Sequence, residues 1–365
     1  MEEILRDVAF AVARFGAFAA HAFLFGLPII LIFVLRPALA SAEGDWAGTR
    51  DRLGRRLQAL VGSALWASAL VTTIALLLQA LLIAKLSRRG DLEFDVFSSV
   101  VESSFGRWHF LRFPLLVSLV VILAGKVRLL ALAGTRSDEK SPGAAWWIGW
   151  CGVAFALLAT SSLSGHAASS SLAPLTVPND ILHLAAGSIW FSGIVLLSAV
   201  LPRGLRALDD RRRLELLAPS VVRFSQVAGI SIVVIAGTGT LNSLVNVAAV
   251  SNLVDSTYGR VLSFKIVVFV VVVALGTTNH FFLRAKLRRA LEEDRPTPSQ
   301  NTFRRIVAVE LTLGLTLMGL TGVLAGSQRT RKSAAPIQAV KSAEFSERFL
   351  RPLRAGPEGL APGAG

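Results

Sequence analysis

The chain has 365 residues, of which 53% are hydrophobic and 17% are charged, and this balance excludes an ordinary soluble domain of that size. Its mean hydropathy of +0.59 is typical of a membrane protein. The formal charge of +14 indicates either nucleic-acid binding or basic cytoplasmic loops. One Cys and two Met exclude a disulfide framework, a cysteine zinc site and a methionine-rich copper relay.

Eight apolar segments are each long enough to cross a bilayer, since a spanning helix needs about 20 residues. They are residues 10–35, 57–84, 108–130, 145–165, 179–201, 224–250, 261–283 and 304–326. We therefore predict an all-α, polytopic membrane protein with eight transmembrane helices. In this prediction, residues 1–144 hold three helices with their loops, residues 145–327 hold five, and residues 328–365 form a disordered tail. The acidic N-terminus lacks the features of a cleaved signal peptide, so we expect the first helix to be retained.

Basic residues gather in alternate connections. The connections after the first, third, fifth and seventh segments hold 22 of the 38 Lys and Arg, whereas the N-terminus and the other connections hold 6. The positive-inside rule then places the four basic connections in the cytoplasm and both termini in the periplasm. The positive charge is thus a topology signal for an inner-membrane protein, and no nucleic-acid partner is expected.

The two halves of the chain resemble each other. The segment SSFGR at 103–107, followed by Arg112, matches STYGR at 256–260, followed by Lys265, at an offset of 153 residues. At an offset of 167, the aligned pairs are Gly26 with Gly193, Arg36 with Arg203, Arg56 with Arg223, Gly62 with Gly229 and Gln79 with Asn246. An even number of helices separates the copies, so the sequence predicts a parallel four-plus-four repeat.

The repeated motif is expected at the periplasmic start of the third and seventh helices. Its second copy contains Tyr258, Gly259 and Arg260, and a cation follows one and a half turns further in, as Arg112 in one copy and Lys265 in the other. A cation at that depth either snorkels outward as an interfacial anchor or handles an anion or a partner.

Four of the five His are expected near the periplasmic side. His166 ends the fourth helix, His183 lies one turn into the fifth, His109 opens the third, and His21 lies about 10 Å deep in the first. Neutral imidazole binds copper, zinc and iron, so these four are candidate metal ligands. The alternative is that each is an interfacial or hydrogen-bonded side chain.

Other polar residues lie within the predicted spans. Glu310 needs a partner or a proton, because an intramembrane carboxylate costs roughly 2.5–3.5 kcal/mol. Asn279 and His280 approach the same cytoplasmic side, so with Glu310 they form either an ion relay or a structural hydrogen bond. Three uncharged residues are candidates for bonds between helices or for a transport path: Gln79, Asn242 and Asn246. The pair Asn179-Asp180 is expected to cap the fifth helix.

Several short segments occur in an order that is similar to one known family. They are Arg223-Phe224-Ser225, Gly237, Thr257-Tyr258-Gly259-Arg260 with Lys265, Gly276-Thr277-Thr278-Asn279, Val309-Glu310-Leu311, Gly165-His166-Ala167, and His183-Leu184 with Trp190 and Gly193. In this order they resemble the copper resistance protein D family of eight-helix bacterial inner-membrane proteins. The resemblance covers residues 145–326 well and the first half more loosely.

That resemblance implies copper handling between periplasm and cytoplasm, in many members alongside a small periplasmic copper-binding protein. With so few Met and Cys, the expected copper ligands are His166, His183 and His21, which suit Cu(II) better than Cu(I). The chain has no phosphate-binding loop, no H-E-x-x-H and no G-x-S-x-G motif, so we predict a transport or tolerance protein and not an enzyme. The alternatives are a haem-binding electron-transfer protein with two His as axial ligands, and an assembly scaffold for other metalloproteins.

Overall fold

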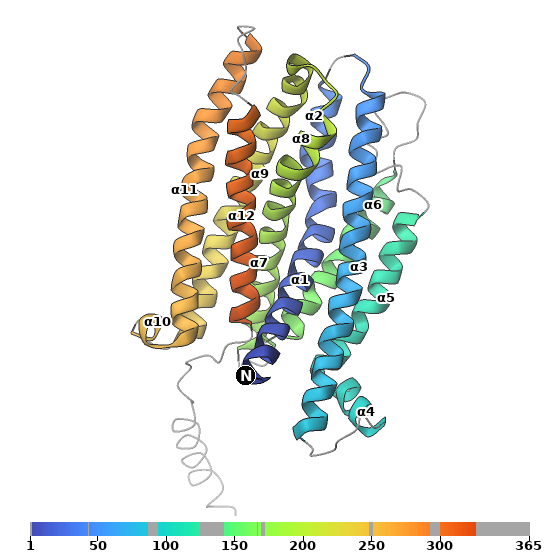
Figure 1. The fold of residues 1–365 in the computed structure, drawn as a ribbon, viewed down its shortest axis with the longest axis vertical. Coiled ribbons are helices and arrows are strands. Elements are labelled where there is room, and N and C mark those ends of the chain that lie inside the picture. The colour runs from blue at the N-terminus through green and yellow to red at the C-terminus, as the bar shows by residue number, and fades with distance from the viewer. Residues whose placement is uncertain are drawn as a thin grey trace, which may run out of the picture.

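The computed structural model describes residues 2–42, 44–86, 94–124, 142–165, 167–168, 172–247, 251–292 and 300–325. Every regular element in these ranges is helical, and the long helices form one elongated bundle (Figure 1). The predicted tail at 328–365 lies outside the described residues.

In the described residues of the first half, six α-helices and one π-helical segment are present. They are α1 (Glu2–Ile30), η1 (Leu31–Leu35), α2 (Arg36–Ala40), α3 (Ala47–Leu86), α4 (Phe94–Glu102), α5 (Ser104–Ala124) and α6 (Ala144–Leu163). The second half consists of α7 (Ala173–Val195), η3 (Leu196–Val200), α8 (Leu201–Gly204), α9 (Asp210–Asn246), α10 (Asn252–Asp255), α11 (Thr257–Glu292) and α12 (Gln300–Leu324).

Seven of the described helical stretches are long and apolar enough to cross a membrane. They are Val8–Ala40, Ala47–Ala84, Ser104–Ala124, Ala144–Leu163, Ala173–Gly204, Asp210–Asn246 and Thr257–Thr278. The eighth predicted span corresponds to α12, whose apolar part, Ala308–Leu324, is shorter. The polytopic membrane architecture is thereby confirmed, with seven rather than eight described helices meeting both criteria.

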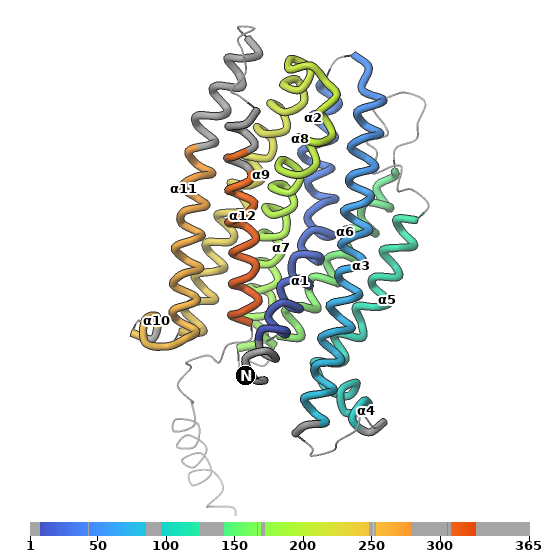
Figure 2. Tube along the Cα trace, viewed as in Figure 1, coloured from blue at the N-terminus to red at the C-terminus, as the bar shows by residue number. Residues whose placement is uncertain are grey.

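Two helices form the centre of the bundle. In the most apolar stretch of α1, with its continuation through α2, 72% of the residues are buried, and in that of α7 with α8 the share is 67%, against 11% for α11. In Figure 2, α3 and α5 lie on one side of this central pair, and α11 and α12 lie on the other. The outer faces of α9 and α11 are lined with exposed apolar side chains such as Ile230, Val233 and Val267, as expected of helices that face lipid.

The central pair packs through small residues. A methyl group added at Gly26 of α1 would lie 2.1 Å from the carbonyl oxygen of Ser188 and 2.4 Å from Oγ of Ser192, both on α7. Ser192 Oγ also donates to the carbonyl oxygen of Ala22, 3.2 Å away. Close approach through Gly and Ser is the usual way in which helices associate in lipid, where the hydrophobic effect gives little driving force.

Each central helix, α1 and α7, is followed directly by a π-helical segment of five residues. The π segments Leu31–Leu35 and Leu196–Val200 are 165 residues apart, and each is followed by a proline, Pro37 or Pro202, in the first turn of the next helix. Proline has no N–H to donate to the carbonyl four residues earlier, which favours a change of hydrogen-bond register at that point. The spacing is two residues shorter than the offset of 167 that aligns Gly26 with Gly193, so the duplication stays a prediction.

The repeated SSFGR/STYGR motif forms the same helix cap twice. Ser103 Oγ accepts a hydrogen bond of 2.9 Å from the N–H of Gly106 at the start of α5, and Ser256 Oγ accepts one of 2.9 Å from the N–H of Gly259 at the start of α11. The serine hydroxyl thus satisfies one of the free N–H groups at each helix start. The sequence match at this motif has a structural cause.

We expect the substitutions Ser103→Ala and Ser256→Ala each to lower the free energy of unfolding by about 1 kcal/mol, because each removes an N-cap acceptor. Ser118→Ala is the matched control, since Ser118 is exposed and its hydroxyl only donates to a carbonyl of its own helix. Thermal unfolding of the detergent-solubilised protein measures all three. A control as destabilised as the two cap variants would contradict the assignment.

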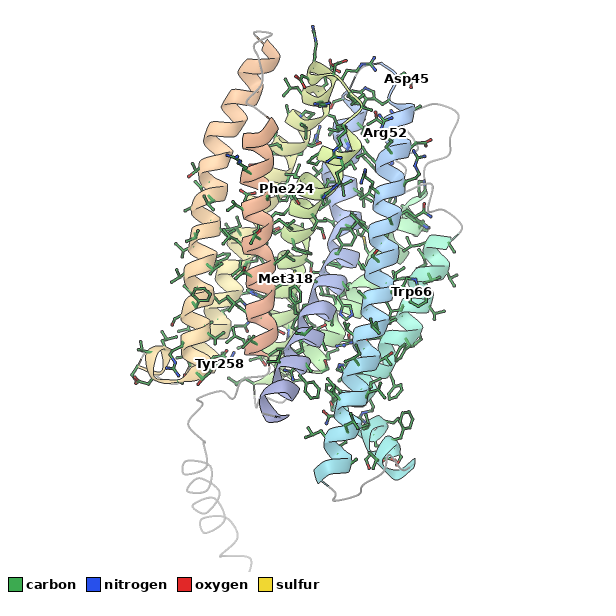
Figure 3. The ribbon with its side chains drawn as sticks, viewed as in Figure 1. Asp45, Arg52, Trp66, Phe224, Tyr258 and Met318 are labelled. Carbon is green, nitrogen blue, oxygen red and sulfur yellow. The ribbon has the colours of Figure 1, made fainter. Side chains whose placement is uncertain are left out.

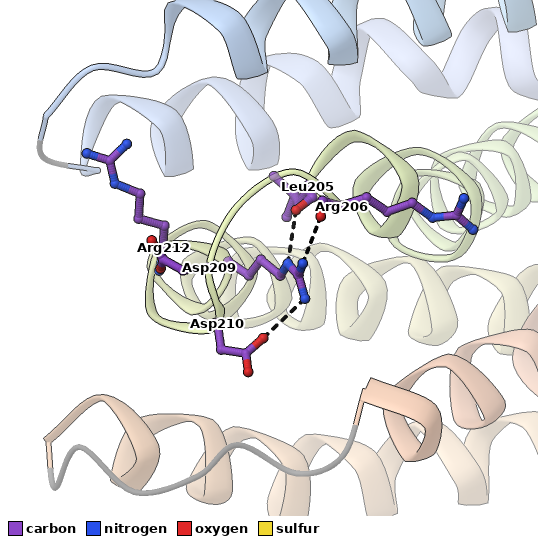
Figure 4. Close-up of polar contacts among 6 residues, drawn as sticks. Leu205, Arg206, Asp209, Asp210 and Arg212 are labelled. Atoms are coloured by element: carbon purple, nitrogen blue, oxygen red, sulfur yellow. Dashed lines mark hydrogen bonds and ion pairs between the residues drawn. The ribbon is translucent and has the colours of Figure 1, made fainter.

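The turns between α2 and α3 and between α8 and α9 lie at one end of the bundle. We call it the basic end, because the chain around these turns contains Arg50, Arg52, Arg206 and Arg211–Arg213. Asp45 and Arg52 lie there, and Tyr258 lies at the opposite end, near the N-terminus (Figure 3). Arg213 donates to the carbonyl oxygens of Leu205 (3.0 Å) and Arg206 (2.8 Å) and to the carboxylate of Asp210 (3.1 Å), as Figure 4 shows. The guanidinium group therefore fixes the turn that precedes α9.

Candidate functional site

His21 is completely buried among the first four long helices. Its Nε2 lies 2.9 Å from Oγ of Ser68 on α3, and its Nδ1 lies 3.1 Å from Oγ of Ser161 on α6. An imidazole has only two ring nitrogens, so both are occupied. A metal would bind His21 only after one of these hydrogen bonds had broken.

His109 is held by its own helix. Its Nδ1 lies 2.8 Å from the carbonyl oxygen of Phe105, and the two rings are stacked with centroids 3.8 Å apart. Because a carbonyl oxygen only accepts, Nδ1 of His109 carries the proton and Nε2 carries the lone pair.

Arg112 interacts electrostatically with both His21 and His109. The structure therefore brings these two histidines into one neighbourhood, but it also places a positive charge there. A cation near either imidazole would be repelled by the guanidinium group, and the repulsion is strongest where little water screens it.

The side chain of Arg112 turns inward toward α6. Its Nε donates to Oγ1 of Thr160 (2.9 Å) and its Nη2 to Oγ of Ser164 (3.2 Å), and only 4% of the residue is exposed. The guanidinium group is therefore held by α6 within the bundle. The two hydroxyl groups, one turn apart on α6, offer acceptors that the lipid does not.

His183 belongs to a second group of polar residues, on α7 and α9. Its Nδ1 lies 2.9 Å from Oγ1 of Thr238, and that hydroxyl donates its own hydrogen to the carbonyl oxygen of Val234, 2.6 Å away. Oγ1 of Thr238 must therefore accept from Nδ1–H of His183, which leaves the lone pair on Nε2. An imidazole oriented in this way is prepared to bind a metal or to accept a proton.

Two asparagines connect α7 to α9 beside His183. Nδ2 of Asn179 donates to the carbonyl oxygen of Thr238 (3.0 Å) and to Oδ1 of Asn242 (2.9 Å). Nδ2 of Asn242 lies 3.5 Å from Oδ1 of Asp180. Asn242 thus links α9 to α7, which is one of the two roles predicted for it, and a part in a transport path stays a prediction. We call Asn179, Asp180, His183, Thr238 and Asn242 the α7–α9 cluster.

The prediction that Asn179 and Asp180 cap the fifth helix is wrong. Helix α7 begins at Ala173, with a proline in its first turn, so the pair lies in the second turn. Proline at a helix start costs nothing, because the N–H that it lacks would be unpaired there anyway. The side chains of Asn179 and Asp180 are thereby available to α9.

Lys265 of α11 lies next to this cluster. It is half-buried, and its charge interacts with both Asp180 and His183. The other members of the STYGR motif have structural roles or are exposed. Tyr258 is buried, the N–H of Gly259 bonds to the capping serine, and the Arg260 side chain is exposed.

The structure says less about the remaining candidate residues. Asn246 is buried and donates to the carbonyl oxygen of Asn242, 2.7 Å away on its own helix. Gln79 on α3 and Glu310 on α12 are half-buried. His166 and the side chains of Asn279 and His280 lie outside the described residues, so a relay between Glu310 and His280 stays a prediction.

Within the described part of the chain, no group of three or more His, Cys, Asp or Glu side chains is arranged to hold a metal ion. The histidines instead fall into two separate neighbourhoods, with His21 and His109 near Arg112 and His183 near Asp180 and Lys265.

Sequence reasoning missed the hydroxyl residues that orient the imidazoles. Thr238 was detectable, because Thr238, Asn242 and Asn246 recur every four residues and so share one face of α9. Ser68 and Ser161 had no such signal, since an isolated serine in an apolar helix usually bonds to its own backbone.

Matches to two protein-family descriptions together cover most of the chain. Residues 4–173 match the copper resistance protein D-like N-terminal domain, and residues 218–324 match copper resistance protein D. The chain belongs to the copper resistance protein D family. Members of this family are multi-pass bacterial membrane proteins for copper resistance and transport and not enzymes.

Two curated members of this family are similar to the chain. Copper resistance protein D of Pseudomonas syringae pv. tomato is 24% identical over 322 residues, which are 87% of this chain and 95% of that protein. Copper transport protein CutJ of Bacillus subtilis (strain 168) is 32% identical over 174 residues, which are 47% of this chain but only 31% of that protein. No solved structure matches the chain.

Proposed function

We propose that this chain moves copper ions between the periplasm and the cytoplasm, and that copper first binds at the α7–α9 cluster through Nε2 of His183. The names of the two relatives support copper as the ion. With the basic end in the cytoplasm, as the positive-inside rule predicts, the α7–α9 cluster would lie in the periplasmic half of the membrane.

The observation that carries this proposal is the bond between His183 and Thr238. It fixes the tautomer in which Nε2 has the lone pair, which is the arrangement that outer-shell partners impose on metal-bound histidines. Asp180 adds a carboxylate nearby. Imidazole and oxygen ligands suit Cu(II) better than Cu(I).

His166 is the second ligand that we propose. The residue after it, Ala167, has its carbonyl oxygen 2.9 Å from Oγ1 of Thr176 in the first turn of α7. Ala167, the residue that follows His166 in the sequence, is therefore held against the helix that carries His183. We leave His21 and His109 out of the site, because His21 has no free ring nitrogen and Arg112 is close to both.

Lys265 opposes a cation at this position, since its ammonium group interacts with Asp180 and His183. We expect Lys265→Gln to tighten copper binding about tenfold, because it removes a positive charge beside the site. Arg260→Gln is the control, as Arg260 is exposed five residues earlier on the same helix. Competition titration with a copper chelator measures both variants. Weaker binding by Lys265→Gln would mean that Lys265 supports the site rather than opposing it.

The proposed function is tested by metal analysis and absorption spectroscopy of the purified full chain, followed by copper flux into sealed vesicles. We expect about one copper per chain, no Soret band, and flux that depends on the protein. A Soret band would favour the haem-binding alternative, and a copper-free protein without flux would favour the assembly scaffold. Right-side-out and inside-out vesicles, compared side by side, give the direction of transport.

A further inference from the structure

Arg112 carries a buried positive charge for which the described residues provide no negative partner. Its two hydrogen bonds go to the neutral hydroxyls of Thr160 and Ser164, and it is 4% exposed. A buried charge costs several kcal/mol unless an opposite charge or a full set of hydrogen bonds compensates it. In the described part of the chain Nη1 of Arg112 makes no hydrogen bond.

The second half of the chain shows what is missing in the first. The position equivalent to Arg112 is Lys265, at the offset of 153, and Lys265 interacts with the carboxylate of Asp180. At the offset of 167 that aligns Gly26 with Gly193, the residue equivalent to Asp180 is Ala13, which is buried. The first half has kept the cation and has an alanine where the second half has a counter-charge.

The surroundings of Arg112 are polar and rich in hydroxyl groups. Ser68 and Ser161 lie on the two helices that contact His21, and one turn from Ser68 is Thr72, whose hydroxyl is buried without a hydrogen-bond partner in the described residues. Thr160 and Ser164 donate their own hydroxyl hydrogens to the carbonyl oxygens of Leu157 (2.6 Å) and Ser161 (3.5 Å), so the donor left for a small anion is Nη1 of the guanidinium group.

We propose that Arg112, held in place by Thr160 and Ser164, binds one small monovalent anion of halide or carboxylate chemistry through Nη1 of its guanidinium group. The anion accepts a charge-assisted hydrogen bond from the guanidinium group and takes the place that Asp180 has beside Lys265. The single positive charge and the low exposure of Arg112 favour a monovalent anion over phosphate or sulfate.

A bound anion would also change the electrostatics of the neighbouring histidines. Arg112 interacts with His21 and His109, so neutralising it removes the repulsion that a cation meets in this half of the bundle. This site is distinct from the α7–α9 cluster, and it stands whether or not His183 binds copper.

The test uses the purified full chain in a chloride-free gluconate buffer. Radiolabelled chloride is titrated at constant ionic strength, and the melting temperature is followed in parallel by tryptophan fluorescence. We expect saturable binding of about one chloride per chain and a rise in melting temperature on binding. Formate and acetate, titrated as competitors, distinguish the two sources: displacement of chloride identifies a site open to carboxylates, and its absence identifies a halide site.

Arg112→Gln should weaken chloride binding about tenfold to a hundredfold, because it removes a charge-assisted hydrogen bond. Arg107→Gln is the matched control, since Arg107 is exposed five residues earlier on α5 and should leave binding unchanged. Where Arg112→Gln fails to fold, Ser164→Ala serves as the milder variant, with binding expected to fall severalfold. Absence of saturable chloride, formate or acetate binding by the wild-type chain would overturn the proposal, as would equal binding by Arg112→Gln.

Discussion

Replacing His183 with Ala is expected to weaken copper binding about a hundredfold or more and to remove copper flux. The substitution deletes Nε2, the nitrogen that we propose as the copper ligand, while the helix around it has no other described imidazole to substitute for it. Disturbing only the outer-shell partner of a metal ligand typically costs tenfold to a hundredfold in affinity, so loss of the ligand itself should cost at least as much. Chelator competition and vesicle flux measure the effect.

The orientation of the imidazole is tested separately by Thr238→Val. Valine keeps the shape of threonine but removes the oxygen that accepts from Nδ1–H, so the proton of His183 is no longer held on that nitrogen. We expect affinity to fall tenfold to a hundredfold, less than for His183→Ala. Thr240→Val is the control, because Thr240 is exposed two residues later and only bonds within its own helix.

A structural role for His183 would give a different pattern. His109→Phe removes an imidazole that already stacks on Phe105, and we expect copper binding to survive it. If His183→Ala and His109→Phe reduced copper binding equally, or if His183→Ala bound copper as the wild type does, the α7–α9 cluster would not be the copper site.

The membrane architecture was predictable because it depends on properties that are local in the sequence. A helix spans a bilayer when about 20 successive residues are apolar, and this can be counted without knowing what the helix packs against. Even α12, the weakest of the predicted spans, is a helix over Gln300–Leu324. The S-[ST]-[FY]-G-R motif was equally local, and both copies prove to cap a helix.

The arrangement of the polar side chains was not predictable in the same way. Depth in the membrane indicates the level of a residue but not the direction in which its side chain points, so His21 and His183 were expected in one group. In the structure His21 turns toward α3 and α6, whereas His183 turns toward α9. Direction depends on where a hydroxyl from another helix lies, and those partners are 47 to 140 residues away along the chain for these two histidines.

Arg112 shows the same limit in another form. Its depth is compatible with snorkelling, and the sequence left the choice between an anchor and an anion site open. What the sequence does not show is that Thr160 and Ser164, 48 and 52 residues further along the chain, accept two of its hydrogen bonds inside the bundle.

Replacing Gly26 with Ala is expected to lower the free energy of unfolding by about 3 kcal/mol, the upper part of the range for forcing an extra group into a packed interior. The new Cβ would lie 2.1 Å from the carbonyl oxygen of Ser188, and backbone atoms of a central helix cannot rotate away as a side chain can. The two central helices would have to separate. Thermal or denaturant unfolding in detergent, followed by tryptophan fluorescence, measures the change.

Substitutions at two other glycines allow the expected loss of stability to be ranked. A Cβ at Gly193, the repeat equivalent of Gly26, would meet the ring of Phe224, a side chain that can turn aside, so Gly193→Ala should cost less than Gly26→Ala. A Cβ at Gly62 would meet nothing within 4 Å, and Gly62→Ala should be neutral or stabilise its helix by up to about 1 kcal/mol. The expected order of damage is therefore Gly26, then Gly193, then Gly62. Equal effects at Gly26 and Gly62 would show that α1 and α7 do not meet as closely as the structure places them, since only direct contact with a backbone carbonyl distinguishes the two sites.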